Sequence, residues 1–344
     1  MIKSQTLFVL GAGASCEVNF PSGDGLKEKI SKLLNIQFQD GLNQSSGDRD
    51  ILLCLREFGS QSNVGINEIL KSAVRIRDGM PYAISIDNFL DAHSDNKNVE
   101  LCGKLAIVQS ILNAERASHI YYDESNRAFK SKSEVAKTWY PKFFQIISEN
   151  ISKEKSDTIF DNIGIISFKY DRTIEHYLYR ALQDYYGMDS NQSASVMNRL
   201  RIYHPYGTIG KLSWMEGGRK IDFGGTAFGS ELSNLSSGIK TFTERYEDKL
   251  TLESMHSLVS SSEKIVFLGF AYHSQNMQLL SPPPYRGNCS ILGTGLGISD
   301  SELAIVEQEI YTCLKPKSGA FQATIRNTLT CSELFNQYPR FMSS

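Results

Sequence analysis

The chain has 344 residues, of which 41% are hydrophobic and 22% charged, so it can bury a large core and a disordered protein is excluded. Its 36 Lys and Arg residues against 38 Asp and Glu residues give a formal net charge of -2, which argues against a nucleic-acid or anionic-membrane surface. The six cysteines are scattered, which predicts a cytoplasmic protein without a zinc ribbon. No apolar run reaches the ~18 residues of a membrane span, and the glycines at 11 and 13 come too early for a signal peptide. We therefore expect a soluble protein.

Short β-branched or aliphatic runs predict strands, and most of them end at a glycine or a polar turn. In chain order these runs cover residues 6–10, 164–168, 201–204, 264–269 and 290–293. Helical patterns lie between several of them, and strands that alternate with helices predict an α/β fold with a Rossmann-like parallel sheet and helices on both faces. Ligands of such sheets bind at the carboxyl ends of the strands.

About 150 residues separate the first two predicted strands, which is too long for a single crossover helix. Apolar residues recur every four positions from Val135 to Ile147, as on one face of a helix. We expect one unit over residues 1–344, with the Rossmann-like core at about 1–36 and 156–344 and a helical insertion at about 37–155. The polar stretch at 37–49 is expected to be a loop.

The first predicted strand ends at the sequence Gly11-Ala12-Gly13-Ala14-Ser15. Gly11 permits a tight turn, and Gly13 lets a pyrophosphate approach the backbone at the start of the next helix. The third glycine of the full dinucleotide-binding pattern is replaced by Cys16. The motif therefore has two interpretations, a phosphate-binding loop or a turn that only ends the strand.

Two polar motifs follow the next strands. Asp171, in Phe168-Lys169-Tyr170-Asp171, precedes an amphipathic helix, where its carboxylate either caps that helix or contacts a ribose or a catalytic water. His204 and Tyr206 lie in the segment that follows the third strand, where a histidine serves acid–base catalysis, ribose contact or structure alone.

The last two predicted strands end in the same manner. Gly269 and Gly293 close the two apolar runs, and Asn276 and Thr294 follow them. Each of these strand ends alone indicates a turn. Five strand ends that meet at one edge of one sheet predict a ligand site.

Taken in order, these motifs resemble the bacterial SIR2-like domain family, over about residues 5–300. The motifs that carry the resemblance are GAGAS at 11–15, IDNFL at 86–90, FKYD at 168–171, HPYG at 204–207 and LGFAYHSQNM at 268–277. The resemblance implies NAD+ as the substrate, hydrolysis to nicotinamide and ADP-ribose in anti-phage defence, and assembly as a homo-oligomer or with a partner protein encoded nearby. The four-cysteine zinc module of sirtuins is missing, which argues against a protein deacylase and against a metal.

The resemblance also implies roles for particular residues. The pyrophosphate is expected at Gly11, Ala12, Gly13, Ala14, Ser15 and Pro21. Other contacts to NAD+ are expected from Asp87, Gly207, Gly269, Asn276 and Thr294. The expected catalytic residues are His204, Asp171, Lys169 and Tyr206.

Two residues depart from the family pattern. Tyr206 stands where the family often has histidine, and His204, two residues earlier, would face the same side if the segment is extended. Lys169 replaces the usual asparagine, and an ammonium about 4 Å from a cationic ribose would cost ~4 kcal/mol. The sequence leaves four alternatives for Lys169. Its side chain points away from the ribose, pairs with Asp171 or binds a ligand phosphate, or else the substitution marks a weakened enzyme. The alternative function is a catalytically silent module that binds NAD+ or ADP-ribose and signals to a partner protein.

Overall fold

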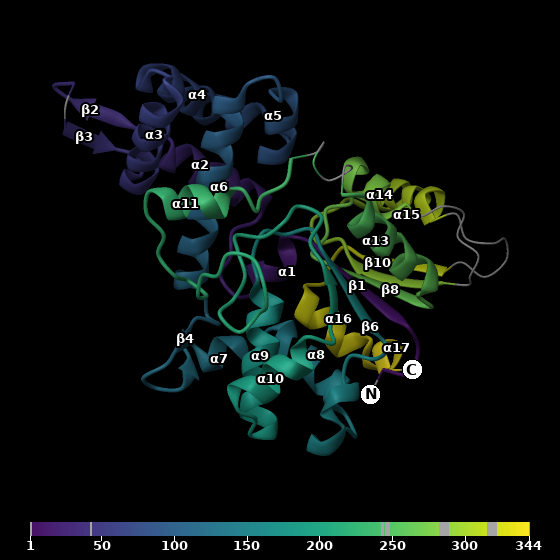
Figure 1. Cartoon of the computed structure of the whole chain (residues 1–344). Coiled ribbons are helices and arrows are strands. Elements are labelled where there is room, and N and C mark those ends of the chain that lie inside the picture. Colours follow the sequence, from purple (N-terminus) through teal and green to yellow (C-terminus); the bar gives the residue numbers. More distant parts are fainter. Residues whose placement is uncertain are drawn as a thin grey trace.

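A parallel β-sheet of six strands lies at the centre of the protein, and helices cover both of its faces (Figure 1). The computed structural model describes residues 2–41, 43–241, 244, 248–281, 289–314 and 322–343. The strands of the sheet are β1 (Thr6–Leu10), β6 (Ile163–Ser167), β7 (Arg201–Tyr203), β8 (Lys264–Leu268), β9 (Ser290–Thr294) and β10 (Gln322–Arg326). The α/β class and the parallel sheet predicted from the sequence are confirmed.

The strands lie in the order β10-β9-β8-β1-β6-β7, and every neighbouring pair is parallel. The chain builds one half of the sheet outward from β1 through β6 to β7. It then returns to the other side of β1 and adds β8, β9 and β10. This is the strand order of doubly wound dinucleotide-binding folds, whose ligands bind where the direction of building reverses. That point lies between β1 and β8.

Strand β10 was missed from the sequence. Its short sequence QATIR has no continuous apolar run, because it pairs with β9 alone at the edge of the sheet. The central strands β1 and β6 are buried at every position, which is why their sequences read as unbroken apolar runs. Leu10 is in register with both Ser167 and Leu268, so the carboxyl ends of β1, β6 and β8 are level.

Most of the remaining chain is helical. The helices that precede β6 are α1 (Gly13–Cys16), α2 (Gly23–Leu33), α3 (Arg49–Ser62), α4 (Ile66–Gly79), η1 (Met80–Tyr82), α5 (Ile86–Ala92), α6 (Lys97–Ala117), α7 (Lys132–Val135), α8 (Trp139–Ser148) and η2 (Lys153–Thr158). Those that follow it are α9 (Thr173–Tyr186), α10 (Ser190–Met197), α11 (Ser230–Ser236), α13 (Lys249–Ser261), α14 (Ser274–Leu280), α15 (Asp300–Leu314), α16 (Cys331–Gln337) and α17 (Pro339–Ser343). The short strands β4 (Tyr122–Asp123) and β5 (Ala128–Phe129) form a separate antiparallel pair.

Different helices cover the two faces of the sheet. Leu7 and Phe8 point to opposite faces because side chains alternate along a strand. The Phe8 ring contacts Phe143 of α8, with 4.9 Å between the ring centroids. Gly164, which is in register with Leu7, lies under Leu258 of α13, and a Cβ on this glycine would be 2.5 Å from Leu258 Cδ1. Helix α8 therefore covers one face and α13 the other.

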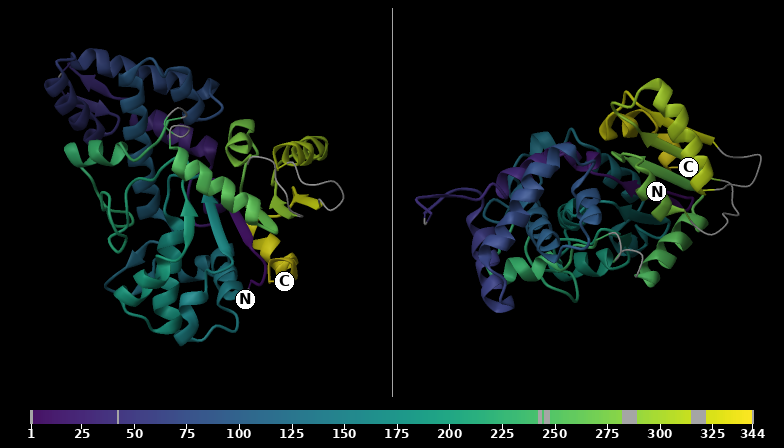
Figure 2. Two further views of the ribbon diagram at one scale, coloured as in Figure 1. Left: turned by 45° about the vertical axis from the view of Figure 1, so that its right-hand side comes forward. Right: turned by 90° about the horizontal axis from the view of Figure 1, so that it is seen from above.

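The helices α2 to α6 and α11 pack together beside the sheet (Figure 2). Helix α6 is the centre of this group, and its side chains are buried along most of its length because α2, α3, α4, α5 and α11 surround it. The predicted boundaries of the helical insertion stay a prediction. The structure adds that α2 and α11 pack with this group, whereas α8 packs on the sheet.

The stretch at 37–49 differs from the expected loop. It forms an antiparallel hairpin of β2 (Gln37–Gln39) and β3 (Asn43–Ser46), and α3 begins at Arg49. Phe38 is the one apolar residue of these two strands and none of their residues is buried, so no apolar alternation marked them as strands. The usable signal was Asp40-Gly41, which both take positive φ (53° and 72°) as a tight hairpin turn requires.

The buried histidine of α9 gives a testable pH dependence. The His176 ring stacks on Phe223 at 3.9 Å, and its Nε2 donates to the carbonyl oxygen of Ile120 at 3.0 Å. Burial, together with the charge of Arg180, lowers the pKa of His176 to about 3. A depressed pKa stabilises the fold above the unfolded value of ~6.5, and this stabilisation is lost as the pH falls from there toward 3.

We therefore expect the free energy of unfolding to fall between about pH 6.5 and pH 4, measured by urea titration. The variant His176→Phe keeps a ring to stack on Phe223 but cannot take up a proton. Its free energy of unfolding should fall less steeply over the same pH range, whatever its absolute stability. An equal slope in both proteins would contradict this assignment.

Candidate functional site

A cavity of about 1000 Å³ opens at the carboxyl edge of the sheet, and we call it the main cavity. Its walls are the loops after β1, β6, β7, β8 and β9, together with the start of α2, the segment from Ile84 to Asp87 and the start of α16. It therefore lies at the reversal point between β1 and β8. A volume of this size is at the upper end of the range for ligand-binding pockets.

About half of the residues predicted for the site line this cavity, although they come from segments far apart in the sequence. They are Gly11, Ala12, Gly13, Asp87, Tyr206, Gly269, Asn276 and Thr294. Ala14 and Ser15 are buried behind the loop that follows β1. Pro21 and Gly207 are not among the residues that line the main cavity.

The glycines have a packing role of their own. A Cβ on Gly11 would lie 2.3 Å from Gly269 O, and a Cβ on Gly13 would lie 2.8 Å from Gly269 Cα. Gly269 has φ +55°, and its own Cβ would be 2.0 Å from Ala14 N. The loops after β1 and β8 thus touch backbone to backbone, and Gly13 N donates to Gly269 O at 3.0 Å. This contact requires the glycines whether or not a phosphate binds.

Lys169 and Asp171 form a buried cluster behind the loop. Lys169 Nζ donates to Ser15 Oγ at 2.7 Å and to Thr173 Oγ1 at 3.0 Å, and it pairs with Asp171 Oδ1 at 3.1 Å. The expected Lys169–Asp171 pair is therefore present, and neither residue lines the main cavity. The ammonium is engaged inside the protein, so it does not extend toward a ligand in the main cavity.

Asp171 is not the N-cap residue of α9, which is Arg172, but its carboxylate binds the start of this helix. Its Oδ1 accepts hydrogen bonds from Thr173 N at 3.1 Å and Thr173 Oγ1 at 2.7 Å, in the first turn of α9. Burial acts to raise the pKa of Asp171, but the Lys169 ammonium and the bonds from Thr173 outweigh it, so this pKa lies below its ordinary value. Asp171 is thus an anionic structural residue in this arrangement.

His204 faces away from the main cavity. Its Nε2 lies 2.8 Å from Glu175 Oε1, its Nδ1 lies 3.3 Å from Lys169 O, and the residue is part of the lining of a second cavity of about 510 Å³. The residues from His204 to Gly207 form a tight turn, in which Gly207 N donates to His204 O at 2.9 Å and Gly207 has φ +72°. Residues two apart share a side only in an extended segment, so the turn directs His204 and Tyr206 into different cavities.

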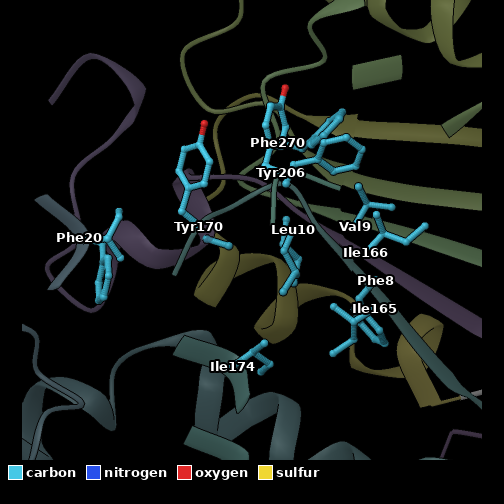
Figure 3. Close-up of a cluster of buried hydrophobic side chains, with 14 of the residues drawn as sticks. Phe8, Val9, Leu10, Phe20, Ile165, Ile166, Tyr170, Ile174, Tyr206 and Phe270 are labelled. Atoms are coloured by element: carbon cyan, nitrogen blue, oxygen red, sulfur yellow. The ribbon is translucent and has the colours of Figure 1, made fainter. Parts of the chain in front are cut away.

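Aromatic rings form one wall of the main cavity. The Tyr170 and Tyr206 rings lie 5.7 Å apart between centroids, and Phe168 and Phe270 pack beside them. Both tyrosine hydroxyls point away from the apolar core around Leu10 (Figure 3). Tyr170 OH donates to Asp87 Oδ1, and Tyr206 OH donates to Asn276 Oδ1. The wall therefore combines flat ring faces with an oriented carboxylate and an oriented amide.

Sequence reasoning missed several residues of the main cavity, including Tyr170 and Glu17. Tyr170 lay within the FKYD motif, and its position next to the strand end was the available signal. The carboxylate of Glu17 accepts from Trp139 N at 2.9 Å and from Ser332 N at 2.8 Å, so it joins α1 to α8 and α16. Burial raises the pKa of Glu17. Nothing local in the sequence indicated this connection.

The charge of the main cavity is one-sided. Glu17, Asp24 and Asp87 are among the residues that line it, whereas no lysine or arginine is found among its described lining residues. Within the described part of the chain, no group of three or more His, Cys, Asp or Glu side chains is placed to hold a metal ion. No helix in that part is both long and apolar enough to span a bilayer.

The fold and the site together define a doubly wound α/β protein with a ligand-sized cavity at the reversal point of its sheet. No protein-family model matches the chain, and no curated protein matches it significantly.

Proposed function

We propose that the protein binds NAD+ in the main cavity and hydrolyses it to nicotinamide and ADP-ribose. The observation that carries the proposal is the position of the cavity, at the reversal point of a sheet with the dinucleotide-binding strand order. The SIR2-like motif order supports the same ligand, because GAGAS, IDNFL, FKYD, HPYG and LGFAYHSQNM all contribute residues to the cavity wall.

The lining of the cavity supports NAD+ over other nucleotides. No lysine or arginine is among the described residues of the wall, so backbone N–H groups and neutral side chains would bind the pyrophosphate. The extra phosphate of NADP+ would find no cationic side chain among these residues. The nicotinamide ring of NAD+ is cationic. The faces of Tyr170 and Tyr206 and the carboxylate of Asp87 are suited to such a ring.

In the proposed reaction the bond between ribose C1′ and nicotinamide N1 breaks, and both electrons leave with the neutral nicotinamide. The ribose becomes a cation, which the carboxylate of Asp87 stabilises. A water oxygen then forms the new bond to C1′ and gives its proton to Asp87, from which the proton passes to solvent. Tyr170 orients Asp87 through its hydroxyl, and Tyr206 and Asn276 position the ribose.

The variant Asp87→Asn tests this role. We expect it to lower kcat for nicotinamide release from NAD+ by about 100-fold or more, because it removes both the negative charge and the proton acceptor. The measurement is free nicotinamide released by purified protein. The matched control is His204→Gln, which changes a residue outside the main cavity and should keep most of the turnover. A large loss in His204→Gln together with full activity in Asp87→Asn would refute the assignment.

A second candidate function is a module that binds NAD+ or ADP-ribose without turnover. It is favoured by one observation: His204, Lys169 and Asp171 are engaged in contacts outside the main cavity. Titration calorimetry with NAD+ distinguishes the two functions. Heat of binding without any nicotinamide would support the silent module, and turnover would exclude it.

The cellular part of the proposal follows from the resemblance to bacterial SIR2-like domains. In that family the activity depletes NAD+ during anti-phage defence, and the proteins act as homo-oligomers or with a partner protein encoded nearby. We extend both features to this chain as proposals. The sequence resemblance is their support.

A further inference from the structure

The second cavity is separated from the main cavity by the turn at His204 to Gly207. Its walls are the end of β7, the loop at 207–219, the end of α11 and residues 237–240. Its volume of about 510 Å³ is in the ordinary range for small-molecule sites. None of the roles proposed for NAD+ uses it, because Tyr206 faces the main cavity and His204 faces this one.

Positive charge gathers around the second cavity. Lys211, Arg219 and Lys240 line it together with His204. The backbones of Lys211 and Arg219 are adjacent, because Lys211 N donates to Arg219 O at 2.7 Å, and Lys211 forms a parallel bridge with Lys220. This gives the second cavity a cationic wall, in contrast to the carboxylates of the main cavity.

Only part of this charge is neutralised by the protein. Lys240 pairs with Asp248, whereas neither Lys211 nor Arg219 is ion-paired with a carboxylate among the described residues. The positive charge that these two residues bring to the wall favours an anion in the cavity. Glu216 lies on the same loop, but it is not among the residues that line the cavity.

Arg219 is also held in place. One nitrogen of its guanidinium, Nη1, donates to the carbonyl oxygen of Asn234 and to Ser237 Oγ, the latter at 2.7 Å. Its other N–H groups have no protein acceptor among the described residues. A fixed guanidinium with unused donors is the group that binds phosphate oxygens best. Gly207, Gly210 and Gly218 line the same cavity, and all three have positive φ.

We propose that the second cavity is a binding site for a small phosphate-bearing molecule, distinct from the NAD+ site. Lys211 and Arg219 contact its phosphate oxygens, and Lys240 borders the site. Because Lys211 and Arg219 are exposed, the affinity should fall as the salt concentration rises.

The test is titration calorimetry with inorganic pyrophosphate. We expect the wild-type protein to bind it, and Lys211→Glu and Arg219→Glu each to weaken binding by about tenfold or more, since each reverses a charge at the phosphate. Lys211→Arg, which keeps the charge, should retain most of the affinity. The matched control is Lys155→Glu, which reverses the charge of an exposed lysine on η2, outside the cavity. Unchanged melting temperatures would show that the variants are folded.

A further variant separates the two cavities. Leu296→Glu places a carboxylate at the wall of the main cavity and should leave pyrophosphate binding unchanged. The proposal is overturned if wild-type protein does not bind pyrophosphate, or if Lys155→Glu weakens binding as much as Lys211→Glu does. It is also overturned if binding survives in Lys211→Glu and is lost in Leu296→Glu, because the anion would then occupy the main cavity.

Discussion

Replacing Arg172 with methionine is expected to lower the free energy of unfolding by about 3–5 kcal/mol, because it leaves a buried charge without a partner. Arg172 is 1% exposed and Glu115 is fully buried. Two hydrogen bonds join them, from Nε to Oε1 at 3.0 Å and from Nη2 to Oε2 at 2.6 Å. The guanidinium also donates to Ile221 O at 2.7 Å, so it connects α6, α9 and the loop before α11. Urea denaturation measures the loss.

The pH dependence of the stability, together with a second substitution, tests whether the unpaired charge of Glu115 causes the loss in Arg172→Met. Burial raises the pKa of Glu115 even with Arg172 present, and removing Arg172 raises it further. A raised pKa means that folding is favoured at low pH and penalised as the pH rises. The deficit of Arg172→Met relative to wild type should therefore be smaller near about pH 5 than near about pH 8.

The matched control is the double variant Arg172→Met/Glu115→Gln. Its neutral amide still accepts the hydrogen bond that Gly224 N donates to Glu115 Oε2 at 2.8 Å. We expect this double variant to be more stable than Arg172→Met alone, since the unpaired charge is gone. If the second substitution destabilises the protein further, the loss arises from packing and not from charge.

Gly269→Ala is expected to lower the free energy of unfolding by about 3 kcal/mol or more and to abolish NAD+ binding. The added Cβ would lie 2.0 Å from Ala14 N and 2.2 Å from Gly13 C, both backbone atoms that cannot turn aside. The positive φ of +55° adds a strain of ~1–2 kcal/mol, and the overlap adds at least as much. The loops after β1 and β8 must separate, which changes the wall of the main cavity.

Gly297→Ala is the matched control for this substitution. Gly297 lines the same cavity and also has a positive φ, of +88°, but nothing lies within 4 Å of its Cβ position. Its free energy of unfolding should fall only by the ~1–2 kcal/mol that the backbone strain costs. Urea denaturation and NAD+ calorimetry on both variants separate strain from overlap. Equal losses of stability and of NAD+ affinity in the two variants would show that the close contact between the loops after β1 and β8 does not cause the effect of Gly269→Ala.

The sequence was informative where local patterns decide the structure. Continuous apolar runs marked β1, β6, β8 and β9 because these strands are buried on both faces. The glycines after β1 and β8 marked the edge at which the main cavity opens. The edge strand β10 carries no such run and was invisible to the same criterion.

Side-chain direction at the site could not be read in the same way. Whether His204 meets the main cavity depends on the turn that ends at Gly207, and whether Lys169 meets it depends on Ser15, which is more than 150 positions away. The contacts of Glu17 with Trp139 and Ser332 are also long-range. A sequence motif shows that a residue lies at the end of a strand. The direction of its side chain depends on contacts with residues that are distant in the sequence.

The central position of β1 has a consequence for the synthesis of the chain. This strand is made well before its neighbours in the sheet, β6 and β8, which begin only at Ile163 and Lys264. At ribosomal rates of ~5–20 residues per second, its apolar residues wait on the order of ten seconds for the first of these neighbours. Contacts this distant in sequence slow folding, and an unpaired apolar strand is prone to aggregate. Expression yield should therefore depend on how well the nascent chain is protected, by chaperones or by lower temperature, until β6 has emerged.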